Sequence, residues 1–179
     1  MKNLLCLFIF LFFTGCITLE SVTPGRISYI STSKQKLNIY DNTDEFTNIR
    51  TIETFINFPE YISKTSFIPR MIYDNNQNIE VYQLAFFVTS TTWYFIDILY
   101  IIINNENIKM KSTYTDRNVM YGGISEWIVF DSSIDMFKKI SMAKNVKMKL
   151  QGSDGSIILE FELKHFEQMK TFIEYINNV

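Results

Sequence analysis

Few side chains in this sequence are suited to catalysis, and the only histidine, His165, is the natural one to consider first. One histidine cannot build a zinc site of several histidines, and a Ser-His-Asp site would have to use it. The G-x-S-x-G motif that presents a nucleophilic serine in many hydrolases does not occur. We therefore expect a protein that is not an enzyme, with no catalytic residue, metal or cofactor.

Acidic residues supply one further candidate, Asp97, which lies inside the apolar stretch WYFIDILYIII. It is either a ligand-binding acid or a structural residue, because an unpaired carboxylate is costly to bury. The structural alternative, which we expect, is a hydrogen bond from Tyr114 or exposure near the end of the sheet. Glu160 and Glu162 alternate with apolar residues, as on the solvent side of a strand.

Aromatic residues supply the second candidate chemistry, a surface that binds a sugar, peptide or lipid. Aromatic rings at strand spacing either line such a surface or pack in the core and across strands, and packing is the commoner use. Both interpretations stay open. The possible ligand surface consists of Trp93, Tyr94, Asp97, Tyr114, Arg117 and Trp127, and Tyr121 is a further aromatic candidate.

The two cysteines belong to an N-terminal segment typical of exported proteins. Lys2 precedes an unbroken apolar run over residues 4–13. This run is too short for a membrane-spanning helix, which needs about 20 apolar residues. A positive start and a short apolar run are the pattern of a signal peptide. Cys6 lies inside the run, and Cys16 follows it.

The sequence Phe13-Thr14-Gly15-Cys16 resembles the lipobox of bacterial lipoproteins, although that family prefers leucine where this chain has Phe13. The resemblance covers residues 1–16 only. It implies that a diacylglycerol is attached to the Cys16 thiol. It also implies that the signal peptide is cleaved between Gly15 and Cys16. Two acyl chains hold a protein on a membrane far more firmly than one.

The same resemblance implies a location. We expect export from the cytoplasm and lipid anchoring in the bacterial cell envelope, with the membrane as a partner through Cys16. In some double-membraned bacteria an Asp after the lipidated cysteine acts as an inner-membrane retention signal. This chain has Ile17 there, so we expect the outer membrane if the source has one. With Cys6 removed and Cys16 acylated, the folded domain has no disulfide.

Charge and length limit the remaining possibilities. The net charge is −2, and no basic tract occurs, so nucleic acid is not an expected partner. We expect a signal peptide over residues 1–15, a lipidated cysteine and short tether over 16–25, and one β-rich globular domain over 26–179. The tether ends in a Pro-Gly turn.

The domain is predicted to be α+β, with mainly antiparallel strands in a sheet or sandwich, one short internal helix and a C-terminal amphipathic helix. Short segments rich in β-branched and aromatic residues predict the strands, the strongest over residues 80–89 and 93–103. Pro69 indicates an edge or a bulge.

The stretch WYFIDILYIIINNENIKMKSTYTDR predicts a hairpin that turns at residues 104–107. With Ile103 opposite Ile108, counting outward places Asp97 opposite Tyr114. Leu99 and Ile101 then face the core, and the opposite face, which carries Lys109 and Lys111, is half solvated.

In the last third, Ser132 is the predicted N-cap of the internal helix. A second hairpin is predicted to turn at residues 152–155, with Ile157, Leu159, Phe161 and Leu163 on one face. The closing stretch HFEQMKTFIEYINN predicts an amphipathic helix that packs on the sheet, or alternatively docks a partner.

These observations favour a non-catalytic binding or scaffolding module for an unknown envelope or extracellular protein. The alternative is a carrier of a small apolar or glycan ligand through its aromatic strands. An envelope hydrolase acting through carboxylates such as Asp97 is the third possibility.

Overall fold

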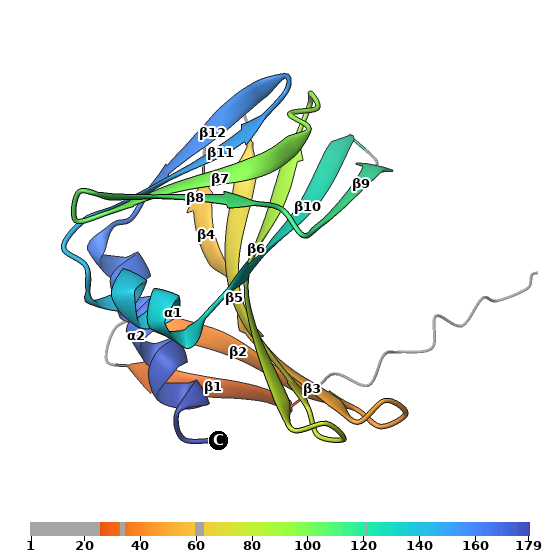
Figure 1. The fold of residues 1–179 in the computed structure, drawn as a ribbon, viewed down its shortest axis with the longest axis vertical. Coiled ribbons are helices and arrows are strands. Elements are labelled where there is room, and N and C mark those ends of the chain that lie inside the picture. Colours follow the sequence, from red (N-terminus) through yellow and green to blue (C-terminus); the bar gives the residue numbers. More distant parts are fainter. Residues whose placement is uncertain (1–25, 33–34, 60–62, 121) are drawn as a thin grey trace, which may run out of the picture.

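The computed structural model describes residues 26–32, 35–59, 63–120 and 122–179, and it contains two antiparallel sheets and two helices (Figure 1). This confirms the predicted fold class. Residues 1–25, which hold the apolar run, Gly15 and Cys16, lie outside the described part. Among the described residues, no helix is long and apolar enough to cross a membrane.

The larger sheet, sheet A, has eight strands in the order β1-β2-β3-β5-β6-β10-β9, with β4 pairing beside β5. Its strands are β1 (Arg26–Thr32), β2 (Gln35–Asp44), β3 (Ile49–Thr54), β4 (Ile56–Pro59), β5 (Lys64–Asp74), β6 (Ile79–Ser90), β9 (Tyr114–Met120) and β10 (Gly123–Ser132). The smaller sheet, sheet B, has the order β12-β11-β7-β8. Its strands are β7 (Ile96–Ile103), β8 (Glu106–Lys111), β11 (Val146–Gly152) and β12 (Gly155–Glu160).

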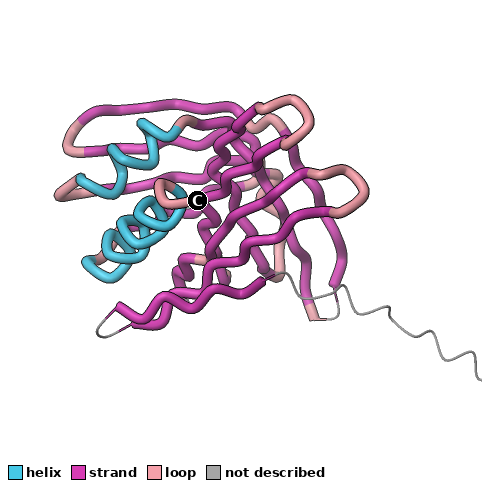
Figure 2. Tube along the Cα trace, turned by 90° about the horizontal axis from the view of Figure 1, so that it is seen from below, coloured by secondary structure: helices cyan, strands magenta, loops and turns pink. Residues whose placement is uncertain are grey.

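Sheet B and both helices, α1 (Ile134–Met142) and α2 (Leu163–Ile176), lie on the same side of sheet A (Figure 1). Seen from below, the helices run beside one another along one side of the strands (Figure 2). Apolar side chains from both sheets and both helices form one core between these layers. Its largest fully buried members include Phe67, Phe86, Phe130, Phe137 and Phe172.

Pro69 lies inside β5, which has neighbours on both sides, and not on an edge strand. Its position coincides with a break in one ladder, because β3 pairs with β5 as far as Arg70 and β4 resumes the pairing at Phe67. A proline cannot donate a backbone hydrogen bond, so this interruption accommodates it. The register is the same on both sides of the interruption, so Pro69 lies at a break in one ladder and not at the predicted edge or bulge.

The β7–β8 hairpin forms, but its register differs from the expected one by two residues. Ile103 faces Glu106 and Ile101 faces Ile108. The turn contains only Asn104 and Asn105, whose φ values of 47° and 79° are typical of a tight two-residue turn of type I′. A shift of two residues preserves the face of each side chain, so Leu99 and Ile101 are buried as predicted.

The predicted pair of Asp97 and Tyr114 is wrong, because the chain leaves sheet B after Lys111 and Tyr114 begins β9 in sheet A. β7 also begins at Ile96 and not at Trp93. Asp97 is exposed at a bulge, where Ile96 pairs with Gly152 and Ile98 with Gln151. Of the two structural alternatives for Asp97, exposure near the end of the sheet is the one observed.

Two further boundaries differ by a few residues. The N-cap of α1 is Ser133 and not Ser132, because β10 continues through Ser132 and the Ser133 side chain accepts from the Met136 N–H at 3.2 Å. The β11–β12 hairpin forms as predicted, with Ile157 and Leu159 buried. Leu163 does not share their face, because it begins α2 and is 74% exposed.

Candidate binding cleft

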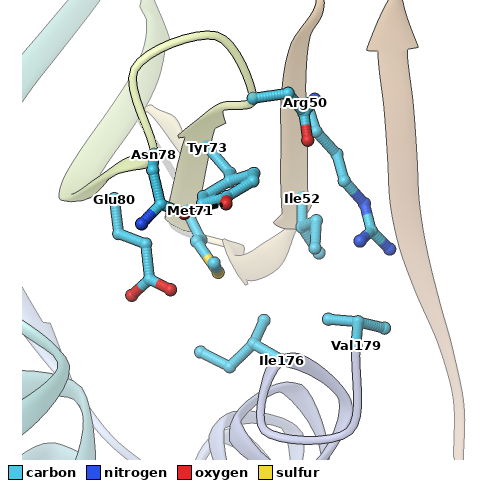
Figure 3. A pocket seen from close by; sticks show the side chains of 9 residues that line it. Arg50, Ile52, Met71, Tyr73, Asn78, Glu80, Ile176 and Val179 are labelled. Atoms are coloured by element: carbon cyan, nitrogen blue, oxygen red, sulfur yellow. Dashed lines mark hydrogen bonds between the residues drawn. The ribbon is translucent and has the colours of Figure 1, made fainter.

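A cleft of about 620 Å³ lies between the C-terminal end of α2 and the inner face of sheet A (Figure 3). Strands β3, β5 and β6, the β5–β6 turn and the end of α2 all contribute to it. Its lining residues are Arg50, Ile52, Met71, Tyr73, Asn75, Asn78, Glu80, Ile176 and Val179.

The cleft has an apolar floor and a hydrogen-bonding rim. Ile52, Met71 and Ile176 form the floor and are less than 10% exposed, as is usual for apolar core residues. In Figure 3, Ile176 and Val179 face Met71 and Ile52 across the opening. The rim carries the Glu80 carboxylate together with polar side chains of the β5–β6 turn. Such a lining suits a ligand that has both an apolar face and polar groups.

One wall of the cleft is fixed by a network that joins β2, β3 and α2. The Arg50 guanidinium donates to both Asp41 carboxylate oxygens, at 2.9 and 2.6 Å. The Tyr175 hydroxyl on α2 donates to the same carboxylate at 2.8 Å. The hydrogen bonds to Asp41 raise the pKa of Arg50 above its usual value. Because the pairing is bidentate and partly buried, it holds the side chains in one geometry.

Glu80, on the opposite wall, pairs with Tyr82, which lies two residues further along β6. The Tyr82 hydroxyl donates to Glu80 Oε2 at 2.7 Å. Burial of the phenol, with a smaller contribution from the Glu80 carboxylate, raises the pKa of Tyr82 to about 12. Tyr82 therefore stays protonated at neutral pH and keeps the Glu80 carboxylate oriented at the rim.

Two turns of the same design end the sheet beside the cleft. In each, an aspartate at the start caps two backbone N–H groups: Asp44 accepts from Phe46 and Thr47, and Asp74 accepts from Asn76 and Gln77. The asparagines that close them, Asn48 and Asn78, have positive φ values of 58° and 56°, which asparagine tolerates better than most residues.

Asparagine side chains join the two turns to each other. Asn75 Nδ2 donates to the Asn48 carbonyl at 2.7 Å, and Asn76 Nδ2 donates to the Thr47 carbonyl at 2.8 Å. Backbone N–H groups of Thr47 and Phe46 also hold the pKa of Asp44 below its usual value. The rim of the cleft is thus a cross-linked pair of turns.

The lining of the cleft contains few charged side chains. The lining residues include one carboxylate and one guanidinium, and they contain no histidine, cysteine or serine. Among the described residues, no group of three or more His, Cys, Asp or Glu side chains is placed to hold a metal ion.

Trp93, Tyr94 and Arg117, three of the predicted surface residues, lie together around a residue that the sequence did not single out, Glu126. The Glu126 carboxylate is 1% exposed. It accepts from the backbone N–H groups of Tyr94, Phe95 and Ile96 at 2.7, 3.2 and 3.0 Å, and from Arg117 Nε at 3.2 Å. These hydrogen bonds fix the crossing between the sheets, the segment over residues 91–95 that connects β6 in sheet A to β7 in sheet B.

The aromatic rings at this crossing stack on one another and on the cation. The rings of Trp93 and Phe95 are 5.8 Å apart, and the Arg117 guanidinium lies 5.4 Å from the Phe95 ring centre. Arg117 also donates to the Ile96 carbonyl at 3.2 Å. The contacts of Arg117 are therefore with the protein itself.

Trp127 and Tyr114 lie on the opposite, outer face of sheet A, since Trp127 is adjacent to Glu126 and pairs with Asp116. Trp127 belongs to a small cluster in which Ile68, Ala85 and Val129 are buried beneath larger rings. The Arg70 guanidinium lies 5.2 Å from the Trp127 ring centre. Tyr114 is 56% exposed. Trp93, Tyr94 and Arg117 are thus separated from Trp127 and Tyr114. Asp97 lies at the β7 bulge, and Tyr121 lies outside the described residues.

His165 lies in the first turn of α2 and is 1% exposed. Its Nδ1 accepts from the Glu162 N–H at 3.0 Å, and its ring lies 4.2 Å from that of Phe58. Burial lowers the pKa of His165, so the ring is neutral at neutral pH. These contacts give it a role in helix capping and packing.

The sequence did not point to the cleft, because its lining comes from three separate segments of the chain, residues 50–52, 71–80 and 176–179. A partial signal was present in the repeated pattern of the two turns, D-x-x-x-N at Asp44 and at Asp74.

Comparisons of the chain with protein-family models, with curated proteins and with solved structures found no match.

Proposed function

We propose that this chain is a lipid-anchored protein of the bacterial cell envelope and that its domain binds a partner without catalysing a reaction. The observation that carries the proposal is the sequence Phe13-Thr14-Gly15-Cys16 directly after a short apolar run with a positive start. The Figure 3 cleft supports the binding part, since its lining offers hydrogen bonds and apolar contact. The outer membrane is the proposed location if the source has one.

The anchor is tested by cell fractionation of the wild type, Cys16→Ser and Cys6→Ser. Wild type and Cys6→Ser are expected in the detergent-soluble membrane fraction, because only Cys16 bears the lipid. Cys16→Ser is expected to lack the lipid modification. A Cys16→Ser chain that still carries the lipid would contradict the proposal.

The ligand proposed for the cleft is a segment of an envelope or extracellular protein. Glu80→Lys reverses the rim charge, and Glu167→Lys makes the same change at an exposed position of α2 away from the cleft. Crosslinking in source cells is expected to capture a partner with wild type and Glu167→Lys, and to lose it with Glu80→Lys. Equal capture by all three proteins would remove the cleft as the binding site.

A second candidate function, a carrier of a small apolar or glycan ligand, is favoured by one observation. A largely apolar hollow of about 430 Å³ lies beside Phe87 and Thr89 at the β4–β5 hairpin. The Phe87 ring is 6.0 Å from that of Trp127. In a Trp93→Phe variant, Trp127 is the only tryptophan left, so its emission is expected to change on adding envelope lipids or glycans. No change in Trp127 emission during the titration would count against this function.

A further inference from the structure

The outer face of sheet B combines lysines with exposed apolar side chains. We call this surface the lysine face. Its central residue is Tyr100, 36% exposed, and the neighbouring Ile102 and Ile158 are 40% and 49% exposed. The lysine face consists of Ile98, Tyr100, Ile102, Lys109, Lys111, Lys147, Lys149, Gln151, Ile158 and Glu160.

Strand register places the cations around Tyr100. Lys149 on β11 and Lys109 on β8 flank it directly across the sheet. Lys109 Nζ lies 5.5 Å from the Tyr100 ring centre. Lys147 and Lys111 occupy the next positions on the same face, two residues along their strands. Lysines on an edge strand such as β8 are a common guard against edge pairing, but β11 is an inner strand and needs no such guard.

The charge of the lysine face is opposite to that of the molecule as a whole. Four lysines stand against one carboxylate, Glu160, which pairs with Lys147 at 2.6 Å. The whole chain has a net charge of −2. The opposite end of the molecule is acidic, with Asp44, Glu45, Asp74 and Glu80 in or beside the two turns and Arg50 already paired with Asp41.

The first described residue, Arg26, lies at the acidic end. Arg26 pairs with Asp41, close to the β2–β3 turn. In Figure 1, β1 and the two turns lie at one end of the molecule and sheet B lies at the other. A chain anchored through Cys16 therefore presents the lysine face away from its own membrane.

We infer that the lysine face is a docking surface for an acidic protein segment that also carries apolar side chains. Lysines supply attraction and faster association, while Tyr100, Ile102 and Ile158 supply contact area. The isoleucines favour a protein over a purely polyanionic glycan, which offers them no apolar partner. A symmetric contact between two copies would bring lysines against lysines, which is repulsive. The choice of a protein over a lipid surface rests on the proposed anchor. The attraction of the lysines for an acidic partner does not depend on that anchor.

The test uses the full chain in nonionic detergent, with a labelled peptide of alternating glutamate and leucine as the probe and fluorescence anisotropy as the readout. Lys109→Gln with Lys149→Gln is expected to weaken binding about tenfold, since two charge contacts are lost. Lys144→Gln with Lys170→Gln removes the same charge from exposed positions elsewhere and is expected to leave binding unchanged. Ile102→Ser is expected to weaken binding without any change in charge.

Several results would overturn the inference. Absence of peptide binding by the wild type, or equal weakening of binding by the two double variants, would exclude the lysine face as the docking surface. Equal binding of poly-glutamate would leave the isoleucines without a role. The last measurement compares binding of the protein to vesicles with and without anionic phosphatidylglycerol. Charge-dependent vesicle binding that the Lys109/Lys149 variant loses, without peptide binding, would assign the face to lipid. The peptide measurement needs no anchor, so a failure of acylation at Cys16 would not alter it.

Discussion

At the scale of single residues, the Glu126 carboxylate links the two sheets, because it lies on β10 of sheet A and binds the backbone at the start of β7 in sheet B. It is 1% exposed and binds three consecutive backbone N–H groups and the Arg117 guanidinium. A buried carboxylate is tolerated only when it is paired and fully hydrogen-bonded. These bonds fix where the chain leaves sheet A for sheet B.

Glu126→Gln is expected to lower the free energy of unfolding by about 2–4 kcal/mol, because the amide loses the charge that faces Arg117 and three N–H groups. Urea denaturation followed by tryptophan emission measures this, since Trp93 lies at the same crossing. Glu160→Gln, an exposed glutamate, is expected to change stability by less than about 0.5 kcal/mol. Similar losses in both variants would contradict this role of Glu126.

His165 gives the fold a pH dependence whose sign follows from its burial. Desolvation lowers the folded-state pKa below the ordinary 6.5, so the unfolded chain takes up this proton more readily than the folded one. Stability from the neutral ring is therefore complete above pH 6.5 and is lost as the pH falls towards the folded-state pKa.

Thermal denaturation between about pH 7.5 and pH 5.5 is expected to show a fall in Tm for the wild type and a flatter profile for His165→Asn. The asparagine retains a side-chain oxygen that can accept from the Glu162 N–H. Parallel profiles for the two proteins would assign the pH dependence to other groups.

At the scale of elements, the close approach of the β11–β12 turn to the β6–β7 crossing depends on a glycine. A Cβ at Gly152 would lie 1.9 Å from the Tyr94 carbonyl oxygen. Gly122 differs, because its φ is +89° and a Cβ there would meet nothing within 4 Å.

Gly152→Ala is accordingly expected to cost about 2–3 kcal/mol, since backbone must move to admit the methyl group. Gly122→Ala is expected to cost only about 1 kcal/mol, the conformational penalty of a positive φ. Chemical denaturation of both variants provides the comparison. A smaller loss for Gly152→Ala than for Gly122→Ala would contradict the packing argument.

The β7–β8 turn allows the opposite change, a stabilisation. Asn105 has a φ of 79°, and Asn-Gly is the preferred pair for a two-residue type I′ turn. Asn105→Gly is expected to raise stability by about 0.5–1 kcal/mol, and Asn105→Val to lower it by about 1–2 kcal/mol. If thermal denaturation gave the reverse order, the turn type would be wrong.

Most elements were predictable because their signals are local. Alternation of apolar residues predicts β11 and β12, and helical spacing predicts the buried face of α2. The register of the β7–β8 hairpin was not predictable, because both a two-residue turn and a longer turn fit the sequence NNEN. Glu126 was not predictable either, since its backbone partners lie 30 to 32 residues away in the chain and meet it only in the tertiary fold. The candidate surface divided for the same reason: Arg117 and Trp127 face opposite sides of one sheet.

At the scale of the whole molecule, the described domain is electrically polar. In Figure 1, the two turns and β1 lie at one end and sheet B lies at the other. The first end carries the acidic turn residues and the cleft, and sheet B carries the lysine face. The proposed anchor at Cys16 would give this polarity a direction, with the lysine face turned away from the membrane. In that orientation the cleft and the lysine face would lie at different distances from the membrane. Such an arrangement suits a protein that binds two partners at once.

The central claim is most directly tested by the mass of the protein extracted from source-cell membranes. We predict a mature chain that begins at Cys16, with a diacylglycerol on its thiol, and that lacks residues 1–15. An unmodified chain that begins at Met1, or a cleaved chain with an unmodified Cys16, would contradict the account of a lipid-anchored envelope protein.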